Sequence, residues 1–183
     1  MFYAPQPCVV LYSLSMRILG IDPGLATVGL GLIEVDPAKH IKVVEWLTIS
    51  TSAGRDLGER LKEIHDDLST YLEEMSPDLA CIEKLFFATN TKTAIDVAQA
   101  RGCILQCTAA KGIAILEPTP LQLKICITGD GKASKEQMQQ MIQRSLSLPS
   151  PPEPDDAADA LGLALYGAWT AALHRSITAA ANH

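Results

Sequence analysis

ILGIDPGLATVGLG, residues 18–31, is an apolar run that carries a single carboxylate, Asp22, directly before a Pro-Gly turn. Such a run predicts a buried strand, and proteins rarely bury a carboxylate that has no partner. Asp22 is therefore either an ordinary turn-forming residue or a side chain that faces something requiring negative charge. The remainder of the sequence has to distinguish these two interpretations.

The elements that follow this stretch occur in an order that predicts a mixed sheet. Strands are predicted at 17–22, 27–35, 41–50 and 79–83 and from about 112, and helices at 56–75, at 91–110, after the capping box Ser134–Gln137, and from about Asp155. Three strands in a meander, then alternating strands and helices, favour an α/β fold whose five-stranded sheet carries helices on both faces. In that arrangement the ends of the first and fourth strands can lie close together, so Asp22 and Glu83 would meet.

The last helix adds further acids near its start. Asp156 and Asp159 are three residues apart and share one helical face, while Asp155 adds a third carboxylate. Helix capping explains one of these acids easily, because carboxylates stabilise helix N-termini, but it explains a second acid among Ala and Leu less well. Carboxylates from three elements at one place repel each other, and Mg²⁺ relieves that repulsion through oxygen ligands. The pattern predicts metal-dependent hydrolysis of a phosphodiester.

Composition fits one globular domain whose charge is unevenly distributed. The 183 residues are 48% hydrophobic and 20% charged, with a net charge of -6. Residues 84–144 hold 8 Lys and Arg against 4 Asp and Glu, between two acidic segments. That middle segment could bind phosphates, although an uneven but solvated surface explains the charge equally well. The five cysteines form no CxxC pair, which argues against a cysteine-ligated metal.

The ends of the chain are expected to lie outside the functional domain. Residues 1–15 resemble a signal peptide only superficially, because no Lys or Arg precedes their short apolar run. We interpret them as a dispensable extension, residues 16–175 as a single nuclease domain, and residues 176–183 as a tail. No apolar stretch approaches the roughly 18 residues that span a bilayer, and a cytoplasmic location is expected.

Four motifs together resemble the RuvC-type Holliday-junction resolvases of the RNase H-like superfamily. They are IDPGLATVGLG, CIEKLFFATN, AQARG and DDAADALGLAL, in that order, and the resemblance covers about residues 16–173. It implies a homodimeric endonuclease that resolves four-way DNA junctions by paired symmetric nicks in recombination and repair. It also implies two Mg²⁺ ions per site, replaceable by Mn²⁺, and a branch-migration helicase complex as partner.

The resemblance also assigns site residues, position by position. The positions matching the family's catalytic, metal-binding acids are Asp22, Glu83, Asp156 and Asp159, and those matching its DNA contacts are Phe86, Lys124 and Lys135. Physical chemistry agrees with the second set, since an aromatic ring can stack on an unpaired base and lysine offers a point charge to phosphate. Phe86 could equally be a core residue, and Lys135 an ordinary surface residue in the first turn of a helix.

Two departures and three rival interpretations remain. Lys84 follows Glu83 where a neutral amide is common, and Asp155 adds an acid beside Asp156. Another RNase H-like nuclease, one that trims ribosomal RNA precursors, is disfavoured by the DDAAD and AQARG motifs. An actin-like ATPase, suggested by DPGLATVG, needs two large lobes, for which this chain is short. A non-catalytic junction binder predicts the loss of at least one acid, and all four are present.

Overall fold

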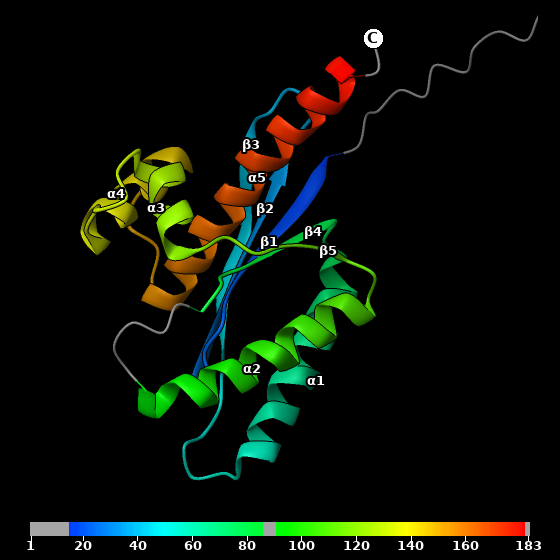
Figure 1. Cartoon of the computed structure of the whole chain (residues 1–183), viewed down its shortest axis with the longest axis vertical. Helices are drawn as coiled ribbons and strands as arrows, with labels where there is room; N and C mark the ends of the chain where they lie inside the picture. Colours follow the sequence, from blue (N-terminus) through cyan, green and yellow to red (C-terminus); the bar gives the residue numbers. More distant parts are fainter. Residues whose placement is uncertain (1–14, 86–90, 182–183) are drawn as a thin grey trace, which may run out of the picture.

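The computed structural model describes residues 15–85 and 91–181, which contain a five-stranded mixed sheet (Figure 1). The strands are β1 Met16–Asp22, β2 Thr27–Val35, β3 Ile41–Ser50, β4 Leu79–Ile82 and β5 Ala114–Leu116. They lie in the order β3-β2-β1-β4-β5. The first three strands pair antiparallel, whereas β4 pairs parallel with both β1 and β5. The predicted α/β class and mixed sheet are confirmed.

Helices cover both faces of this sheet, as the sequence predicts (Figure 1). They are α1 Leu57–Met75, α2 Thr91–Ala110, α3 Pro120–Thr128, α4 Lys135–Ser145 and α5 Asp155–Ala181. α1 and α2 close one core, which includes Leu19 and Ile104, and α3 to α5 close the other, which includes Ile18 and Leu161. None of the helices in the described ranges is both long and apolar enough to cross a membrane.

Glycines on one face of the sheet allow α5 to lie directly against β1 and β2. A Cβ on Gly20 would lie 1.8 Å from the carbonyl oxygen of Ala160, and one on Gly29 would lie 2.0 Å from that of Asp156. No side chain fits at such distances, so glycine is required at these positions for close approach rather than for its backbone freedom. The first turns of α5 are therefore held close to the end of β1.

Residues 119–127, for which the sequence predicts neither a helix nor a strand, belong to α3, Pro120–Thr128, and to its N-cap Thr119. Thr119 accepts a hydrogen bond from the backbone N–H of Gln122, whose side chain bonds back to Thr119, and Pro120 occupies the first turn. Both features stabilise a helix start. The capping box predicted at Ser134 and Gln137 is confirmed at the start of α4.

The fifth strand is shorter than the sequence suggested. Gly112, with a φ of 71°, ends the preceding helix in a turn, and pairing with β4 begins only at Ala114. Pro118, shortly after the strand, has no N–H to extend a ladder. At the other end of the chain, α5 continues through residue 175 to Ala181.

Candidate active site

Asp22 and Glu83 lie next to each other because they end neighbouring parallel strands. The residues just before them are paired in the register of β1 and β4. Side chains alternate between the faces of a strand. Gly20 faces α5 and Cys81 belongs to the core beneath α5. Asp22 and Glu83, each two residues further on, therefore point to the same face as α5, and the predicted meeting of these two acids is confirmed.

The N-terminal turns of α5 bring the other acids over the same strand ends. Asp22 is paired in register with Gly29 of β2, and the carbonyl of Asp156 approaches that glycine closely. Just before the helix, the carbonyl of Glu153 accepts a hydrogen bond of 3.0 Å from the indole of Trp46 on β3. This bond ties the Pro-rich connection to the edge strand and helps fix where α5 begins.

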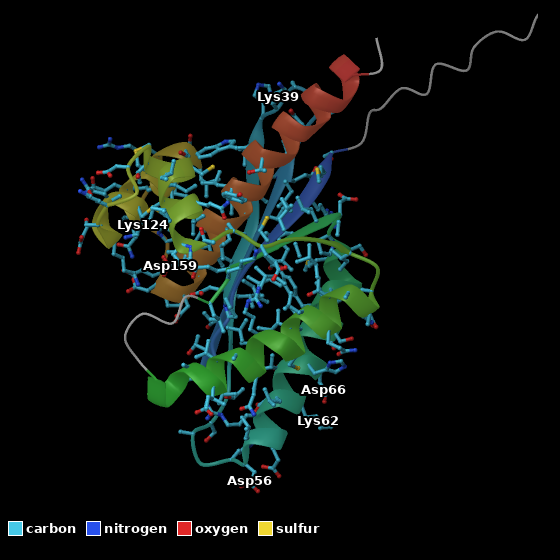
Figure 2. All side chains as sticks on the ribbon, in the orientation of Figure 1. Lys39, Asp56, Lys62, Asp66, Lys124 and Asp159 are labelled. Atoms are coloured by element: carbon cyan, nitrogen blue, oxygen red, sulfur yellow. The ribbon has the colours of Figure 1, made fainter. Side chains whose placement is uncertain are left out.

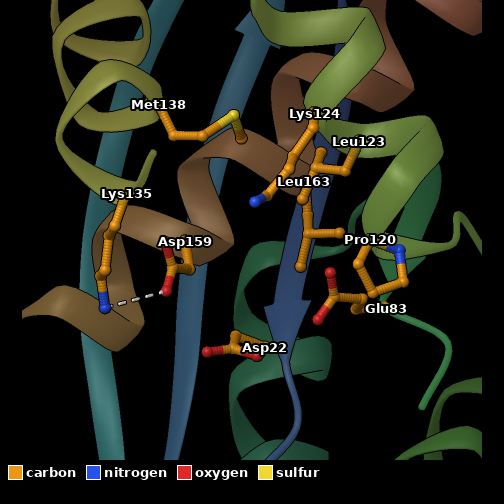
Figure 3. Close-up of a pocket in the computed structure, with 9 residues that line it drawn as sticks. All are labelled: Asp22, Glu83, Pro120, Leu123, Lys124, Lys135, Met138, Asp159 and Leu163. Atoms are coloured by element: carbon orange, nitrogen blue, oxygen red, sulfur yellow. Dashed lines mark ion pairs between the residues drawn. The ribbon is translucent and has the colours of Figure 1, made fainter. Parts of the chain in front are cut away.

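A pocket of about 220 Å³ lies between these strand ends and the helices α3, α4 and α5 (Figure 3). Its lining residues are Asp22, Glu83, Pro120, Leu123, Lys124, Lys135, Met138, Asp159 and Leu163. Figure 3 shows the carboxylates of Asp22, Glu83 and Asp159 directed toward the same space from β1, the end of β4 and α5. Pro120, Leu123, Met138 and Leu163 make one wall apolar, so the site combines three acids with an apolar surface.

Burial and mutual repulsion perturb all three carboxyl groups. Burial, followed by the charges of Asp159, Glu83 and Asp156, raises the pKa of Asp22 from 3.8 to about 7. Burial and the charge of Asp159 raise the pKa of Glu83 to about 7, and burial raises that of Asp159. Acids whose charged form is disfavoured in this way gain most from a cation, because a cation removes both the repulsion and the unfavourable desolvation.

Two lysines complete the pocket on the side of α3 and α4. Lys135 Nζ lies 3.0 Å from Asp155 Oδ2 and 3.5 Å from Asp159 Oδ2, and the hydrogen bond to Asp155 contributes most to the raised pKa of Lys135. Lys124 Nζ donates a 2.8 Å hydrogen bond to the carbonyl of Ala133. Lys124 and Asp159 lie on the same side of the molecule, far from α1 (Figure 2).

The donor set fits a hard divalent cation by its chemistry. Carboxylate oxygens are the ligands that Mg²⁺ prefers, and burial and neighbouring acids disfavour the charged forms of Asp22 and Glu83, which a cation would relieve. In the described part of the chain, however, no three His, Cys, Asp or Glu side chains are close enough together to hold one ion. The Lys135 ammonium supplies a positive charge beside Asp159 instead. Holding one ion between these carboxylates would require them to move closer together than they lie in this structure.

Most of the predicted site residues are brought together. Asp22, Glu83, Asp159, Lys124 and Lys135 line the pocket. The carboxyl group of Asp156 is not among the lining groups, although its charge is near enough to raise the pKa of Asp22. The predicted DNA contact Phe86 lies outside the described residues.

The apolar wall of the pocket was not predicted from the sequence; it is formed by Pro120, Leu123, Met138 and Leu163. The capping box and N-terminal proline of α3 are the local signals that could have revealed the helix carrying two of these residues. The sequence also left open the role of Asp155, which accepts a hydrogen bond of 3.0 Å from Gln139 in addition to its ion pair with Lys135.

Comparisons with known proteins show which family the chain resembles over most of its length. The family described as crossover junction endodeoxyribonuclease RuvC matches residues 18–166. The proteins of that name from Fusobacterium nucleatum and Syntrophomonas wolfei are each 47% identical over 150 residues, which are 82% of this chain and 78% and 87% of theirs. The Thermus thermophilus RuvC structure has a TM-score of 0.80 at 30% identity and covers 87% of this chain and 97% of that one. The same protein in complex with Holliday junction substrate has a TM-score of 0.78 at 28% identity, covering 86% and 96%.

Proposed function

This chain belongs to the RuvC family of crossover junction endodeoxyribonucleases, and we propose that the pocket formed by β1, β4 and α5 is its catalytic centre. The reaction is hydrolysis of DNA phosphodiesters at a four-way (Holliday) junction. The observation that carries the proposal is the convergence of Asp22, Glu83 and Asp159 on a half-apolar pocket that two lysines also line.

Asp22, Glu83 and Asp159 would hold two Mg²⁺ ions, with Asp156 assisting and Mn²⁺ able to replace Mg²⁺. When bound, these ions supply electrophilic activation of the phosphodiester and lower the pKa of the attacking water. Asp22 has the central place, since the charges of both other acids act on it. At neutral pH and without a cation, Asp22 and Glu83 retain protons part of the time, so metal binding displaces protons and strengthens as the pH rises.

The lysines and Phe86 would act on the DNA. Lys135 and Lys124 line the pocket, and each ammonium group can hydrogen-bond a phosphate oxygen of bound DNA. Once Lys135 turns from Asp159 to phosphate, Asp159 is free to bind metal. We assign to Phe86 the stacking on an unpaired base near the scissile phosphate that the family resemblance implies.

The symmetry of the substrate indicates how many subunits the active protein contains. Two symmetric nicks in a junction require two sites related by a two-fold axis, which a homodimer with one site per subunit provides. We place this activity in residues 16–175 and in the cytoplasm, with residues 1–15 dispensable, residues 176–183 a tail, and a branch-migration helicase complex as partner.

A synthetic four-way junction, labelled on each strand in turn, tests the function. With Mg²⁺ we expect paired nicks at symmetric positions for the wild-type protein. Asp22→Asn should bind the junction but leave it intact, and a linear duplex of the same sequence should not be cut. Cleavage by Asp22→Asn at the wild-type rate, or nicks without symmetry, would contradict the proposal.

A further inference from the structure

Arg101 is a largely buried cation beside the candidate catalytic centre that the reaction described above does not use. It comes from the AQARG motif and lies on α2. Its side chain is only 15% exposed. Its Nε donates a 2.7 Å hydrogen bond to the backbone carbonyl of Glu83, and its Nη2 forms an ion pair with the carboxylate of Glu117. One guanidinium thus contacts the residue that follows β4 and the residue that follows β5.

The backbone at Glu83 lies just beyond the regular pairing of its strand. The β1–β4 ladder ends at the residue before Glu83, and the β4–β5 ladder ends one residue earlier still. On the next residue, the N–H of Lys84 donates a 2.8 Å hydrogen bond to the carbonyl of Pro118. Arg101 and this backbone bond together hold the chain where it leaves the sheet. The guanidinium replaces the ladder hydrogen bond that the Glu83 carbonyl would accept in a longer strand.

This anchor matters because Glu83 lies beyond the last paired residue of β4, so the strand ladder does not hold its backbone. Its side chain lines the pocket together with Asp159, and small displacements of catalytic groups reduce rates strongly. Groups that orient a metal ligand from behind typically contribute 10- to 100-fold to metal affinity or activity.

We propose that Arg101 is a positioning residue, which fixes the backbone at the end of β4 and thereby aims Glu83 into the pocket. The inference rests on the proposed function, because it assigns Glu83 to the catalytic centre. Arginine is needed rather than lysine, since the planar fork reaches the Glu83 carbonyl and the Glu117 carboxylate from different nitrogens, whereas an ammonium is a single point charge.

The test compares Arg101→Lys and Arg101→Met with a matched control, Lys111→Met. Lys111 forms an ion pair with Glu73 that joins the turn after α2 to α1, so its loss removes a comparable contact away from the pocket. Two readouts are needed: Mn²⁺ affinity without DNA, followed by electron paramagnetic resonance, and single-turnover cleavage of a four-way junction whose affinity is measured separately in Ca²⁺.

We expect both Arg101 variants to bind Mn²⁺ at least about 10-fold more weakly and to cleave about 10- to 100-fold more slowly. Junction affinity should stay within about twofold of wild type, and excess Mg²⁺ should restore part of the rate to Arg101→Lys. Lys111→Met should match the wild type in each measurement. If Arg101→Met does not fold, Arg101→Lys alone tests the proposal, because lysine keeps the positive charge opposite Glu117.

Two results would overturn the inference. One is Mn²⁺ affinity and cleavage at wild-type levels in a folded Arg101→Lys protein. The other is an equal loss in Arg101→Lys and Lys111→Met, which would indicate general destabilisation. Either result is distinct from failure of the proposed function, in which the wild-type protein itself leaves junctions intact or Asp22→Asn cleaves them.

Discussion

Replacing Asp22 by Asn should stabilise the metal-free protein while abolishing its activity. In the absence of a cation, Asp22 is a largely desolvated carboxyl group held among other acids. Asparagine has nearly the same shape but never carries the charge. The substitution therefore removes an unfavourable interaction of the folded state that the unfolded chain does not have.

The size and the sign of this change in the free energy of unfolding follow from the pKa of Asp22. Burial and the neighbouring acids raise it from 3.8 to about 7. The folded protein therefore binds the proton more tightly than the unfolded chain, and its stability falls as the pH rises between these values. A pKa difference of roughly 3 corresponds to about 4 kcal/mol when fully developed above pH 7. Water entry and proton uptake by Glu83 relieve part of the repulsion, so we expect a gain of about 2 kcal/mol from Asp22→Asn.

Thermal unfolding in EDTA at pH 4 and at pH 8 measures this gain. For a chain of this length, 2 kcal/mol corresponds to a Tm increase of roughly 4–8 °C. We expect that increase for Asp22→Asn at pH 8, little difference at pH 4, and no increase for Asp67→Asn on the exposed surface of α1. Mg²⁺ should raise the Tm of the wild type more than that of the variant. A Tm for Asp22→Asn equal to or below that of the wild type at pH 8 would refute the reasoning.

Two further substitutions test how α5 and Lys135 are placed. Gly20→Ala forces a methyl group against the carbonyl of Ala160, so we expect a loss of about 1–3 kcal/mol or more in the free energy of unfolding, together with weakened junction cleavage. Gly58→Ala, on α1 where nothing lies within 4 Å, should instead stabilise the protein slightly, and urea unfolding measures both. Asp155→Asn removes the exposed carboxylate that shares Lys135, so junction affinity, measured by fluorescence anisotropy, should increase by up to about fivefold. An unchanged or weaker affinity would show that Lys135 does not reach the DNA.

The parts of the site that sequence reasoning could predict are those set by strand periodicity and strand order. Once Asp22 and Glu83 are placed at the ends of two strands, alternation of side chains and parallel pairing bring them to one face without further information. The start of α5 can also be predicted from local sequence, because a proline precedes it and acids occupy its first turn. These inferences use the periodicity of each strand, the order of the elements along the chain and the signals at the start of a helix.

The parts that could not be predicted depend on contacts between distant segments. The three-residue spacing of Asp156 and Asp159 places them on one helical face, but only the packing of α5 on β2 decides that Asp159 lines the pocket. The ion pairs of Lys135 depend on how α4 docks beside α5. The role of Arg101 likewise appears only when α2 lies against the ends of β4 and β5.

The helix α3 could not be predicted for a different reason, which lies in its amino-acid composition. Its sequence PLQLKICIT is apolar on most sides and carries almost no periodicity, so it fits a strand or a helix equally well. In the structure, the capping box of Thr119 and Gln122 stabilises the start of this helix. In a sequence, such a box is a weak signal when the residues after it do not follow a helical pattern. Because α3 contributes Pro120 and Leu123, missing this helix also meant missing part of the apolar wall of the pocket, although Lys124 on the same helix was assigned through the family resemblance.

Packing and electrostatics are coupled at this site through the glycine-bearing face of the sheet. Gly20 and Gly29 weaken the strands locally, because they contribute no side chain to the core. The close approach that they permit brings Asp159 toward Asp22 and removes water from both, and this desolvation is the first cause of their raised pKa values. A protein with side chains at these positions would hold α5 further away, leave the carboxylates solvated, and give a cation less repulsion to relieve. The glycines of the opening motif therefore determine how closely the acids of α5 approach those at the strand ends, although none of them contributes a side chain to the pocket.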